Sequence, residues 1–245
     1  MNRPTGRTYD TLQSLPRAPL MEYAKGSVIY SEKCGSLYLV AFGRVKVSRV
    51  LADGHETAVR IVPPGRLFGE CSLINADAGE CAISLDLVRV MAWSRSEIEH
   101  QIDTNSRLGL ALLEEFALAV SEMQDRLQAM ATRQTLERVM LSLLQLQRTL
   151  GVPQADGTMR MAALTQMVIA AHAGTTREIA TTQMIRLRKL GMVRYSRKFI
   201  DVDCEAIEQA LLKGGPPLRN FGSTLTADVQ AKLDGGAITP RFAIR

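Results

Sequence analysis

A run of basic side chains is the part of this 245-residue chain whose residue types and spacing could do chemistry. No acidic residue occurs between Glu178 and Asp201. The basic residues of that stretch are Arg186, Arg188, Lys189, Arg194, Arg197 and Lys198. A footprint of this kind suits contacts with phosphate groups. Taken by itself, the run is better explained as a solvated helix face, so the elements that carry it decide its meaning.

Two short helices joined by a sharp turn are predicted for residues 164–187. Gly174 would end the first helix, where a positive φ is wanted, and Thr175 or Thr176 would cap the second. Ala170 is small enough to let the two helices approach. The apolar residues with the spacing to bury between the helices are Ile169, Ile179, Ile185 and Leu187. This is the pattern of a helix-turn-helix, whose second helix enters the DNA major groove.

Two short alternating strands, 193–195 and 198–202, follow the second helix around a tight turn at Ser196 and Arg197. We interpret these strands as a wing beside the helix-turn-helix. The basic run, the two helices and the wing together predict a DNA-binding unit over residues 135–203. The alternative is a ligand- or redox-sensing regulatory module whose helix-turn-helix makes protein contacts instead of DNA contacts.

Enzyme chemistry is not expected from this sequence. It contains no glycine-rich phosphate loop, no metal-spaced group of His and Glu, and no paired nucleophile and base. We therefore expect no catalytic residue, no metal and no cofactor. His172 falls on an apolar helix position, so we expect a packed core imidazole rather than a metal ligand.

The four cysteines, Cys34, Cys71, Cys81 and Cys204, lie far apart and form no Cys-x-x-Cys pair. This spacing argues against a disulfide framework and against an iron–sulfur cluster. We expect small thiols that are buried or half-exposed. A redox-sensing contact between Cys71 and Cys81 across a loop stays open.

Composition and charge are those of an ordinary globular protein, with 46% hydrophobic residues, 22% charged residues and a net charge of +5. The basic balance permits a nucleic-acid partner without requiring one. No apolar run is long enough to cross a bilayer, and residues 1–7 lack the apolar core of a signal peptide. We expect a cytoplasmic protein with no membrane partner.

Short strands with glycine-bearing turns are predicted between residues 25 and 93, which is typical of a β-sandwich or jelly roll. A long helix follows, and its apolar residues step by three or four. They are Leu108, Leu112, Phe116, Val120, Met123, Leu127 and Met130. We expect one face of this helix to pack on the barrel and another on a second copy of the chain.

The fold class expected is therefore α+β. Residues 1–103 form an N-terminal jelly-roll sensor domain, and 104–134 form a long dimerisation helix with a hinge. Residues 135–203 form the winged helix-turn-helix. Residues 204–245 are a C-terminal extension with a short helix at 205–212 and a weakly ordered tail after it.

Two stretches resemble one protein family. Residues 64–73, Pro-Gly-Arg-Leu-Phe-Gly-Glu-Cys-Ser-Leu, are similar to the turn and short helix of cyclic-nucleotide-binding barrels. The helix-turn-helix and wing are similar to those of the Crp/Fnr transcription regulators. The resemblance covers residues 23–202 and includes the order of barrel, long helix and winged helix. The loop at 151–157 resembles the nitrogen-control branch of the family, which senses 2-oxoglutarate.

The resemblance implies a homodimeric, sequence-specific regulator that binds a twofold-symmetric operator in double-stranded DNA, with RNA polymerase as a plausible partner. Arg177 would then donate hydrogen bonds to guanine O6 and N7, and Glu178 would accept one from a cytosine amino group. Phosphate contacts fall to the helix N-termini and nearby side chains. The DNA-contacting residues expected are Thr165, Gln166, Thr175, Thr176, Arg177, Glu178, Thr181, Thr182, Arg186, Arg197 and Lys198.

Two departures from the family pattern change what it implies. Many relatives carry a second arginine where Thr182 stands, so one strong base contact is missing and the half-site preference should differ. Nucleotide-binding barrels carry Arg-Ser-Ala where Glu80, Cys81 and Ala82 stand, and a carboxylate there repels a cyclic phosphate. The effector is therefore unknown and cyclic AMP is disfavoured. The effector-pocket residues expected are Gly69, Glu70, Cys71, Ser72, Glu80, Cys81, Ala82, Met123 and Gln124.

Overall fold

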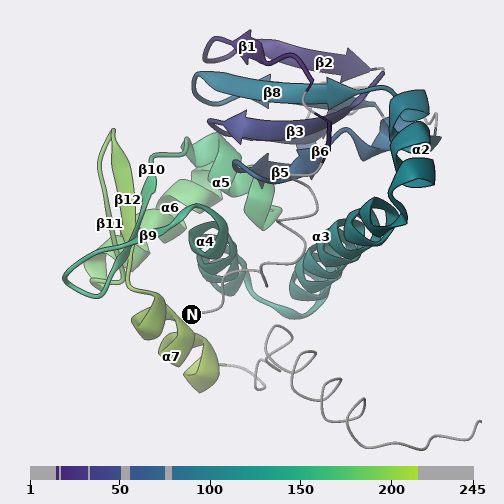
Figure 1. The fold of residues 1–245 in the computed structure, drawn as a ribbon. Helices are drawn as coiled ribbons and strands as arrows, with labels where there is room; N and C mark the ends of the chain where they lie inside the picture. Colours follow the sequence, from purple (N-terminus) through teal and green to yellow (C-terminus); the bar gives the residue numbers. More distant parts are fainter. Residues whose placement is uncertain (1–14, 17, 33, 51–55, 75–78, 215–245) are drawn as a thin grey trace, which may run out of the picture. The chain divides into compact units, whose positions relative to one another are not determined.

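The computed structural model describes residues 15–16, 18–32, 34–50, 56–74 and 79–214. Residues 1–207 form one compact unit, and the described part of the second unit, 208–245, ends at Gly214. Figure 1 shows the order of elements along the chain: a β-rich N-terminal part, a long helix and a mixed C-terminal part. The weakly ordered tail expected after Gly214 lies outside the described residues.

Antiparallel strands build the N-terminal part as two four-stranded sheets. One sheet has the order β1-β8-β3-β6 and the other has the order β2-β7-β4-β5. The strands are β1 (Met21–Tyr23), β2 (Val28–Glu32), β3 (Leu37–Phe42), β4 (Val45–Val50), β5 (Glu56–Val62), β6 (Leu67–Phe68), β7 (Glu80–Ser84) and β8 (Val88–Trp93). A short 3-10 helix, η1 (Glu70–Ile74), follows β6. This arrangement confirms the predicted jelly-roll architecture.

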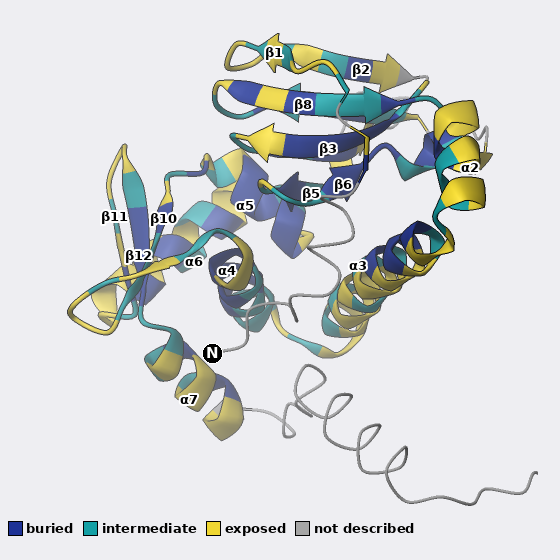
Figure 2. Ribbon diagram, viewed as in Figure 1, coloured by how far each residue is buried: buried dark blue, intermediate teal, exposed yellow. Residues whose placement is uncertain are grey.

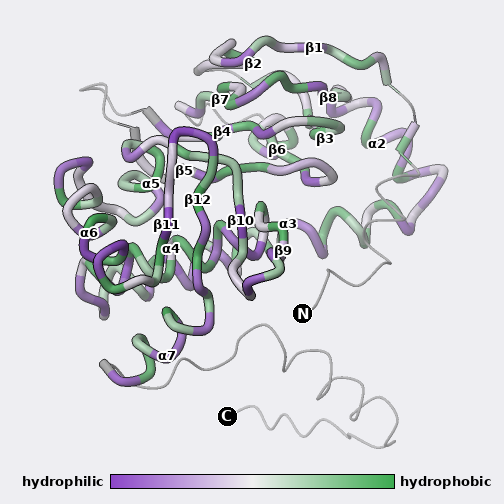
Figure 3. Tube along the Cα trace, turned by 90° about the vertical axis from the view of Figure 1, so that its left-hand side faces the viewer, coloured by the Kyte–Doolittle hydropathy of each residue, from purple (hydrophilic) through white to green (hydrophobic). Residues whose placement is uncertain are grey.

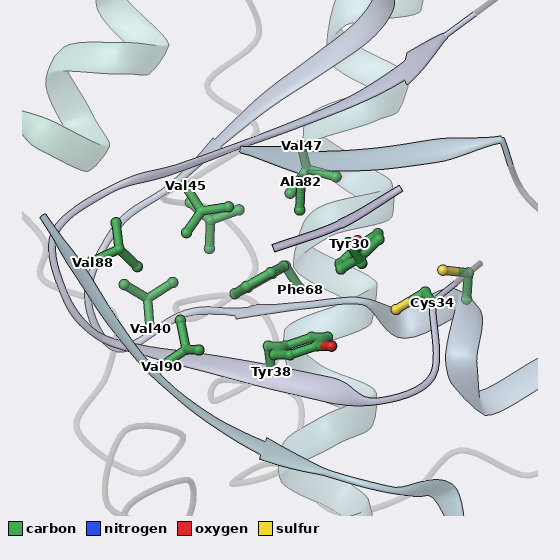
Figure 4. Packing of buried hydrophobic residues seen from close by; sticks show 12 residues of the cluster. Tyr30, Cys34, Tyr38, Val40, Val45, Val47, Phe68, Ala82, Val88 and Val90 are labelled. Carbon is green, nitrogen blue, oxygen red and sulfur yellow. The ribbon is translucent and has the colours of Figure 1, made fainter. Parts of the chain in front are cut away.

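Aromatic rings fill the space between the two sheets. Tyr30, Tyr38 and Phe68 stack with ring centroids 4.9, 5.6 and 6.2 Å apart. Figure 4 shows these rings among valines that come from both sheets. The valines of this cluster are Val40, Val45, Val47, Val62, Val88 and Val90. Alternation along each strand places these side chains inward, so the barrel has a packed interior.

Two helices lead away from the barrel. Ser94 begins α2 (Arg95–Thr104) with a capping box: the hydroxyl of Ser94 accepts from the Glu97 N–H, and the Glu97 carboxylate accepts from the Ser94 N–H at 2.7 Å. The following helix, α3 (Ser106–Thr132), is 27 residues long. Its first turns share a core cluster with the barrel. That cluster contains Leu37, Leu39, Leu67, Trp93, Ile98, Leu108 and Leu112.

The C-terminal part contains the predicted winged helix-turn-helix. Its elements are α4 (Thr135–Leu150), β9 (Val152–Pro153), β10 (Met159–Ala162), α5 (Gln166–Ala173), α6 (Arg177–Lys189), β11 (Val193–Tyr195), β12 (Phe199–Val202) and α7 (Cys204–Gly214). The strands form one antiparallel sheet with the order β11-β12-β10-β9. Residues 151–157, expected as a plain loop, begin with the edge strand β9, which pairs with β10.

Candidate nucleic-acid interface

The first helix of the pair begins and ends at defined caps. The Thr165 hydroxyl accepts a hydrogen bond from the Val168 N–H at 3.3 Å, which satisfies one free donor of the first turn of α5. Gly174 ends the helix at φ +63° and ψ +47°, in the left-handed region that favours glycine. The Gly174 N–H reaches back to the carbonyls of Ala170 and Ala171. The turn between the helices is therefore fixed by backbone chemistry, as the sequence predicted.

The second helix, α6, is capped by Thr176 rather than by Thr175. The Thr176 hydroxyl accepts from the Ile179 N–H at 3.4 Å, and this position has an extended backbone. Glu178 lies in the first turn, where a negative charge interacts favourably with the helix dipole. Its own N–H and the Thr176 hydroxyl lower the pKa of Glu178 below the ordinary value. Glu178 is therefore an ionised acceptor at neutral pH, as a contact to a base amino group requires.

The contact between the two helices differs from the predicted one in two residues. Ile169 and Leu187 are buried as expected, together with Ala180 and Met184. Ile179 and Ile185 were expected in the same contact, but their side chains are 41% and 37% exposed. Ile179 and Ile185 are direct neighbours of the buried Ala180 and Met184, and consecutive residues of a helix point about 100° apart, so both side chains turn away from the contact.

The outward face of α6 carries most of the residues expected to contact DNA. Arg177, Glu178, Thr182 and Arg186 are exposed, and Thr181 is half-buried. Thr181 donates its hydroxyl proton to the Arg177 carbonyl at 2.7 Å, and Thr182 donates to the Glu178 carbonyl at 3.0 Å. Both hydroxyl protons are thus engaged by the helix itself, so these side chains can offer a ligand only a methyl group and the acceptor lone pairs of the oxygen.

The wing presents a basic turn between β11 and β12. Ser196 organises this turn by accepting from the Lys198 N–H at 3.1 Å and the Phe199 N–H at 3.3 Å. Arg197 and Lys198 are exposed at its tip. Figure 3 shows the hydrophilic turn that joins the two strands. Such a turn can follow a phosphate backbone while α6 faces the bases.

Two arginines of the wing sheet are held within the sheet by acidic partners. Arg160 forms a bidentate pair with Asp201, at 2.6 and 2.8 Å. Arg194 pairs with Asp156 and lies 3.5 Å from Asp201. The Arg160 hydrogen bonds lower the pKa of the buried Asp201, and Thr158 with Arg194 lowers the pKa of Asp156. Arg194 therefore contributes less to a phosphate footprint than the sequence run indicated.

The helix-turn-helix also contacts the C-terminal half of α3. Arg126 donates to the His172 carbonyl at 2.9 Å, and the Gly174 Cα approaches Met130 so closely that a Cβ would meet the methionine methyl at 2.5 Å. His172 is buried, and burial with the nearby Arg126 charge lowers the pKa of His172 to about 3. The imidazole is thus a neutral core group.

The barrel turn that resembles nucleotide-binding barrels is built as the resemblance implies. Gly69 has φ +84°, and a Cβ there would lie 2.6 Å from the Ser36 carbonyl oxygen. The Ser72 hydroxyl donates to the Gly69 carbonyl at 2.7 Å and closes the first turn of η1. Glu70 and Cys71 follow Gly69 in this turn.

The polar and charged side chains near this turn form an ion pair and a hydrogen bond within the barrel. Arg60 on β5 pairs with Glu70 at 2.8 Å, and the Tyr30 hydroxyl donates to Glu80 at 3.0 Å. Burial, strengthened by the Glu80 charge, raises the pKa of Tyr30 above its ordinary value. Sequence reasoning missed Arg60 and Tyr30. Arg60 could have been noticed because it is the one charged residue in the apolar C-terminal half of β5.

The remaining expected pocket residues are divided between two places. Cys81 and Ala82 are buried on β7, while Met123 and Gln124 are exposed on α3. Cys71 has the thiol of Cys34 as a hydrogen-bonding neighbour, a pair that the sequence did not single out. Burial raises the pKa of both thiols, which disfavours the reactive thiolate.

The apolar stripe of α3 changes from buried to exposed along the helix. Leu108 and Leu112 are buried against the barrel, and Phe116 packs partly on the same cluster. Further along, Val120, Met123, Leu127 and Met130 are exposed. Figure 2 shows this change along the helix. The exposed residues repeat at spacings of three and four, as in a coiled-coil seam.

Metal sites and membrane spans are both lacking in the part of the chain that the structure describes. Among the described residues, no group of three or more His, Cys, Asp or Glu side chains is arranged to hold a metal ion. Within the same residues, no helix is long and apolar enough to cross a membrane.

Comparison with known proteins gives a matching family model for the N-terminal part and similar proteins for most of the chain. Residues 20–105 match the cyclic nucleotide-binding domain. The chain is 25% identical over 207 residues to the global nitrogen regulator of Synechocystis sp., a match that covers 82% of this chain and 92% of that protein. It is 26% identical over 184 residues to the CRP-like cAMP-activated global transcriptional regulator of Mycobacterium tuberculosis, covering 74% of this chain and 82% of that protein.

Solved structures show the same fold. A CRP/FNR-family transcriptional regulator from Thermus thermophilus has a TM-score of 0.65 and 24% identity, and covers 78% of this chain and 97% of that one. FixK2 from Bradyrhizobium japonicum has a TM-score of 0.66 and 22% identity, and covers 79% and 97%. The barrel, the long helix and the winged helix-turn-helix thus share their fold with solved CRP/FNR-family regulators, and most of the chain is similar in sequence to curated transcription regulators.

Proposed function

We propose that this protein is a DNA-binding transcription regulator of the Crp/Fnr type. It would act as a homodimer that inserts two copies of α6 into successive major grooves of a twofold-symmetric operator. The observation that carries the proposal is the exposed first turn of α6, where Arg177 and Glu178 stand beside the caps that orient the helix. An arginine there can donate two hydrogen bonds to guanine, and an ionised glutamate can accept from cytosine. This pair would read the duplex sequence.

Phosphate contacts are assigned to groups around that reading face. The N-terminal turns of α5 and α6 offer backbone N–H groups beside Thr165, Gln166 and Thr176. Arg186 on α6 and the wing tip at Arg197 and Lys198 add positive charge. These groups would position the protein on the duplex without reading its sequence.

Dimerisation is assigned to the exposed stripe of α3. Val120, Met123, Leu127 and Met130 present apolar side chains at coiled-coil spacing to the solvent of the single chain. Pairing this stripe with its copy would bury the apolar area around a twofold axis. That symmetry is what matches two recognition helices to two half-sites.

The barrel is proposed to work without cyclic AMP. Glu80 places a carboxylate where nucleotide-binding relatives carry an arginine, and Arg60 is already paired with Glu70. The three stacked rings also occupy the interior. A cyclic phosphate entering here would meet the like charge of Glu80, and the neighbouring Arg60 would have to leave Glu70 to neutralise it. We propose that DNA binding is controlled by another small molecule or by the amount of protein. The protein would act in the cytoplasm, with RNA polymerase as a partner.

Selection of bound duplexes from a random pool tests the proposal. The expected product is a twofold-symmetric site whose half-sites are separated by about one helical turn, roughly 34 Å. Sedimentation of the same preparation should give two chains per duplex. Absence of any enriched sequence at low ionic strength, with a folded monomer in solution, would contradict it and favour a module that acts through protein contacts.

A further inference from the structure

The middle of the recognition helix carries an apolar patch where DNA-reading helices commonly carry charge. Thr182 and Ile185 lie on the same face of α6 as Glu178 and Lys189, because their spacings of four, three and four residues match the helix period. All four of these side chains are exposed. Their common face is the outward one, opposite the buried Ala180, Met184 and Leu187.

The hydroxyl of Thr182 is turned into the helix. It donates to the Glu178 carbonyl at 3.0 Å, so its proton is not available to a base. What remains for a ligand is the methyl group and the acceptor lone pairs of the hydroxyl oxygen. Ile185 adds a larger aliphatic surface one turn further along, 37% exposed in the described chain.

The exposed Ile185 side chain would be stabilised by contact with an apolar group of a ligand. The face is flanked by Arg177 at the N-terminal end of the helix and by Arg186 and Lys189 at the C-terminal end, which suits a polyanion. In the major groove the apolar group displayed by a base pair is the C5 methyl of thymine. The positive charges at the two ends of α6 thus complement the phosphates of the groove. The apolar groups of Thr182 and Ile185 complement the methyl group of a thymine between them.

We infer that Thr182 and Ile185 form a thymine-methyl recognition site, which makes them specificity-determining residues of the DNA interface. This inference rests on the proposed function, since it requires α6 to lie in the major groove. Arg177 and Glu178 read a G·C pair by hydrogen bonding, and Thr182 with Ile185 read a neighbouring T·A pair by methyl contact. The site therefore differs from one in which two arginines recognise bases by hydrogen bonding.

The test replaces single thymines by deoxyuridine in the selected operator, symmetrically in both half-sites. Uracil keeps every hydrogen-bonding group of thymine and lacks only the methyl. One thymine per half-site should be sensitive, with affinity falling roughly fourfold for one half-site and fifteenfold for both, as expected for one buried methyl group. At the same position, a C·G pair that binds weakly should recover part of its affinity when its cytosine is 5-methylated.

Matched variants assign the methyl contact to its residues. Thr182→Val keeps the methyl and removes the hydroxyl, so it should keep the discrimination against uracil. Thr182→Ser keeps the hydroxyl and removes the methyl, so it should reduce the discrimination, and combination with Ile185→Ala should abolish it. All these positions are exposed, so the variants should fold.

The outcomes separate this inference from the proposed function. Tight binding to the selected operator with no uracil-sensitive thymine overturns the methyl-recognition site and leaves the proposed function standing. Undiminished discrimination in the Thr182→Ser, Ile185→Ala double variant also overturns it. If no duplex is bound at low salt, the proposed function fails and the inference fails with it.

Discussion

The guanidinium of Arg66, in the turn before β6, pairs with the buried carboxylate of Glu115 on α3. These residues are 49 positions apart and join the barrel turn to the long helix. Burial raises the pKa of Glu115, and the Arg66 charge opposes that rise. The carboxylate therefore depends on this cation to remain ionised inside the protein.

Arg66→Met should lower the free energy of unfolding by about 3 kcal/mol at neutral pH, because it leaves a buried charge without its partner. The loss should shrink in acid, since a protonated Glu115 needs no cation. Urea unfolding at several pH values measures both effects. Arg95→Met breaks an exposed pair with Glu99 and should cost less than about 0.5 kcal/mol. Equal losses for the two variants would mean that the Glu115 pair is solvated.

Leu127→Glu should convert the dimer to a monomer. Leu127 is 67% exposed in the single chain, and two charges in the seam would replace two aliphatic contacts. The dissociation constant should rise by about a hundredfold or more. Sedimentation equilibrium measures this change.

The control for that substitution is Leu118→Glu. Leu118 is 46% exposed and lies nine residues before Leu127, which places it on the opposite side of α3. The same chemical change there should leave the dimer intact. Dissociation by both variants, or by neither, would contradict a dimer seam along Val120, Met123, Leu127 and Met130.

Arg177→Ala should lower affinity for the selected operator by roughly tenfold to a hundredfold per half-site, with the dimer unchanged. Arg194→Ala removes the same charge from an arginine held by Asp156 and Asp201, so its effect should be severalfold smaller. Titration of labelled duplex at fixed salt compares them. Equal losses would show that charge alone, rather than base contact, carries the binding.

Cyclic AMP should leave the thermal unfolding midpoint of the protein unchanged, because the Glu80 carboxylate disfavours its phosphate. A ligand present at a hundred times its dissociation constant would add about 2.7 kcal/mol to stability and raise the midpoint by several degrees. A melting series with cyclic AMP, and with 5′-AMP as control, measures this. A saturable rise with cyclic AMP alone would contradict the proposed independence.

Local patterns in the sequence predicted the elements of the fold because their causes are local. Gly174 ends α5 for a backbone reason, and the alternation in strands sets which side chains point inward. The period of a helix, however, fixes only which residues share a face. The spacing predicted that Ile185 and Leu187 are both buried, whereas Leu187 is buried and Ile185 is exposed.

The ion pairs of the candidate sites could not be read from spacing. Arg60 meets Glu70 because β5 and η1 are neighbours in space, and Asp156 reaches Arg194 across 38 residues. Such pairs depend on the sheet order, which the sequence does not display. They decide which cations are held by carboxylates, and the basic run from Arg186 to Lys198 did not show that Arg194 is one of them.

Lowering the pH should destabilise the protein through His172. Its pKa falls to about 3 in the folded state, because burial and the Arg126 charge both disfavour the imidazolium. Its Nδ1 atom has no hydrogen-bond partner among the described residues. Between about pH 6.5 and 3, the unfolded chain binds a proton at this residue that the folded chain does not bind. Stability must therefore fall as the pH drops through that window.

The His172 contribution should approach a slope of about 1.4 kcal/mol per pH unit. His172→Gln removes the titration, so the difference in unfolding free energy between variant and wild type should change with pH by that slope from about pH 6 to 4. His100→Gln, on the exposed face of α2, is the matched control and should change the free energy of unfolding by less than about 0.5 kcal/mol. A pH-independent difference for His172→Gln would mean that the folded protein accepts the proton, and that α5 opens near its packing against Arg126 and Met130 to do so.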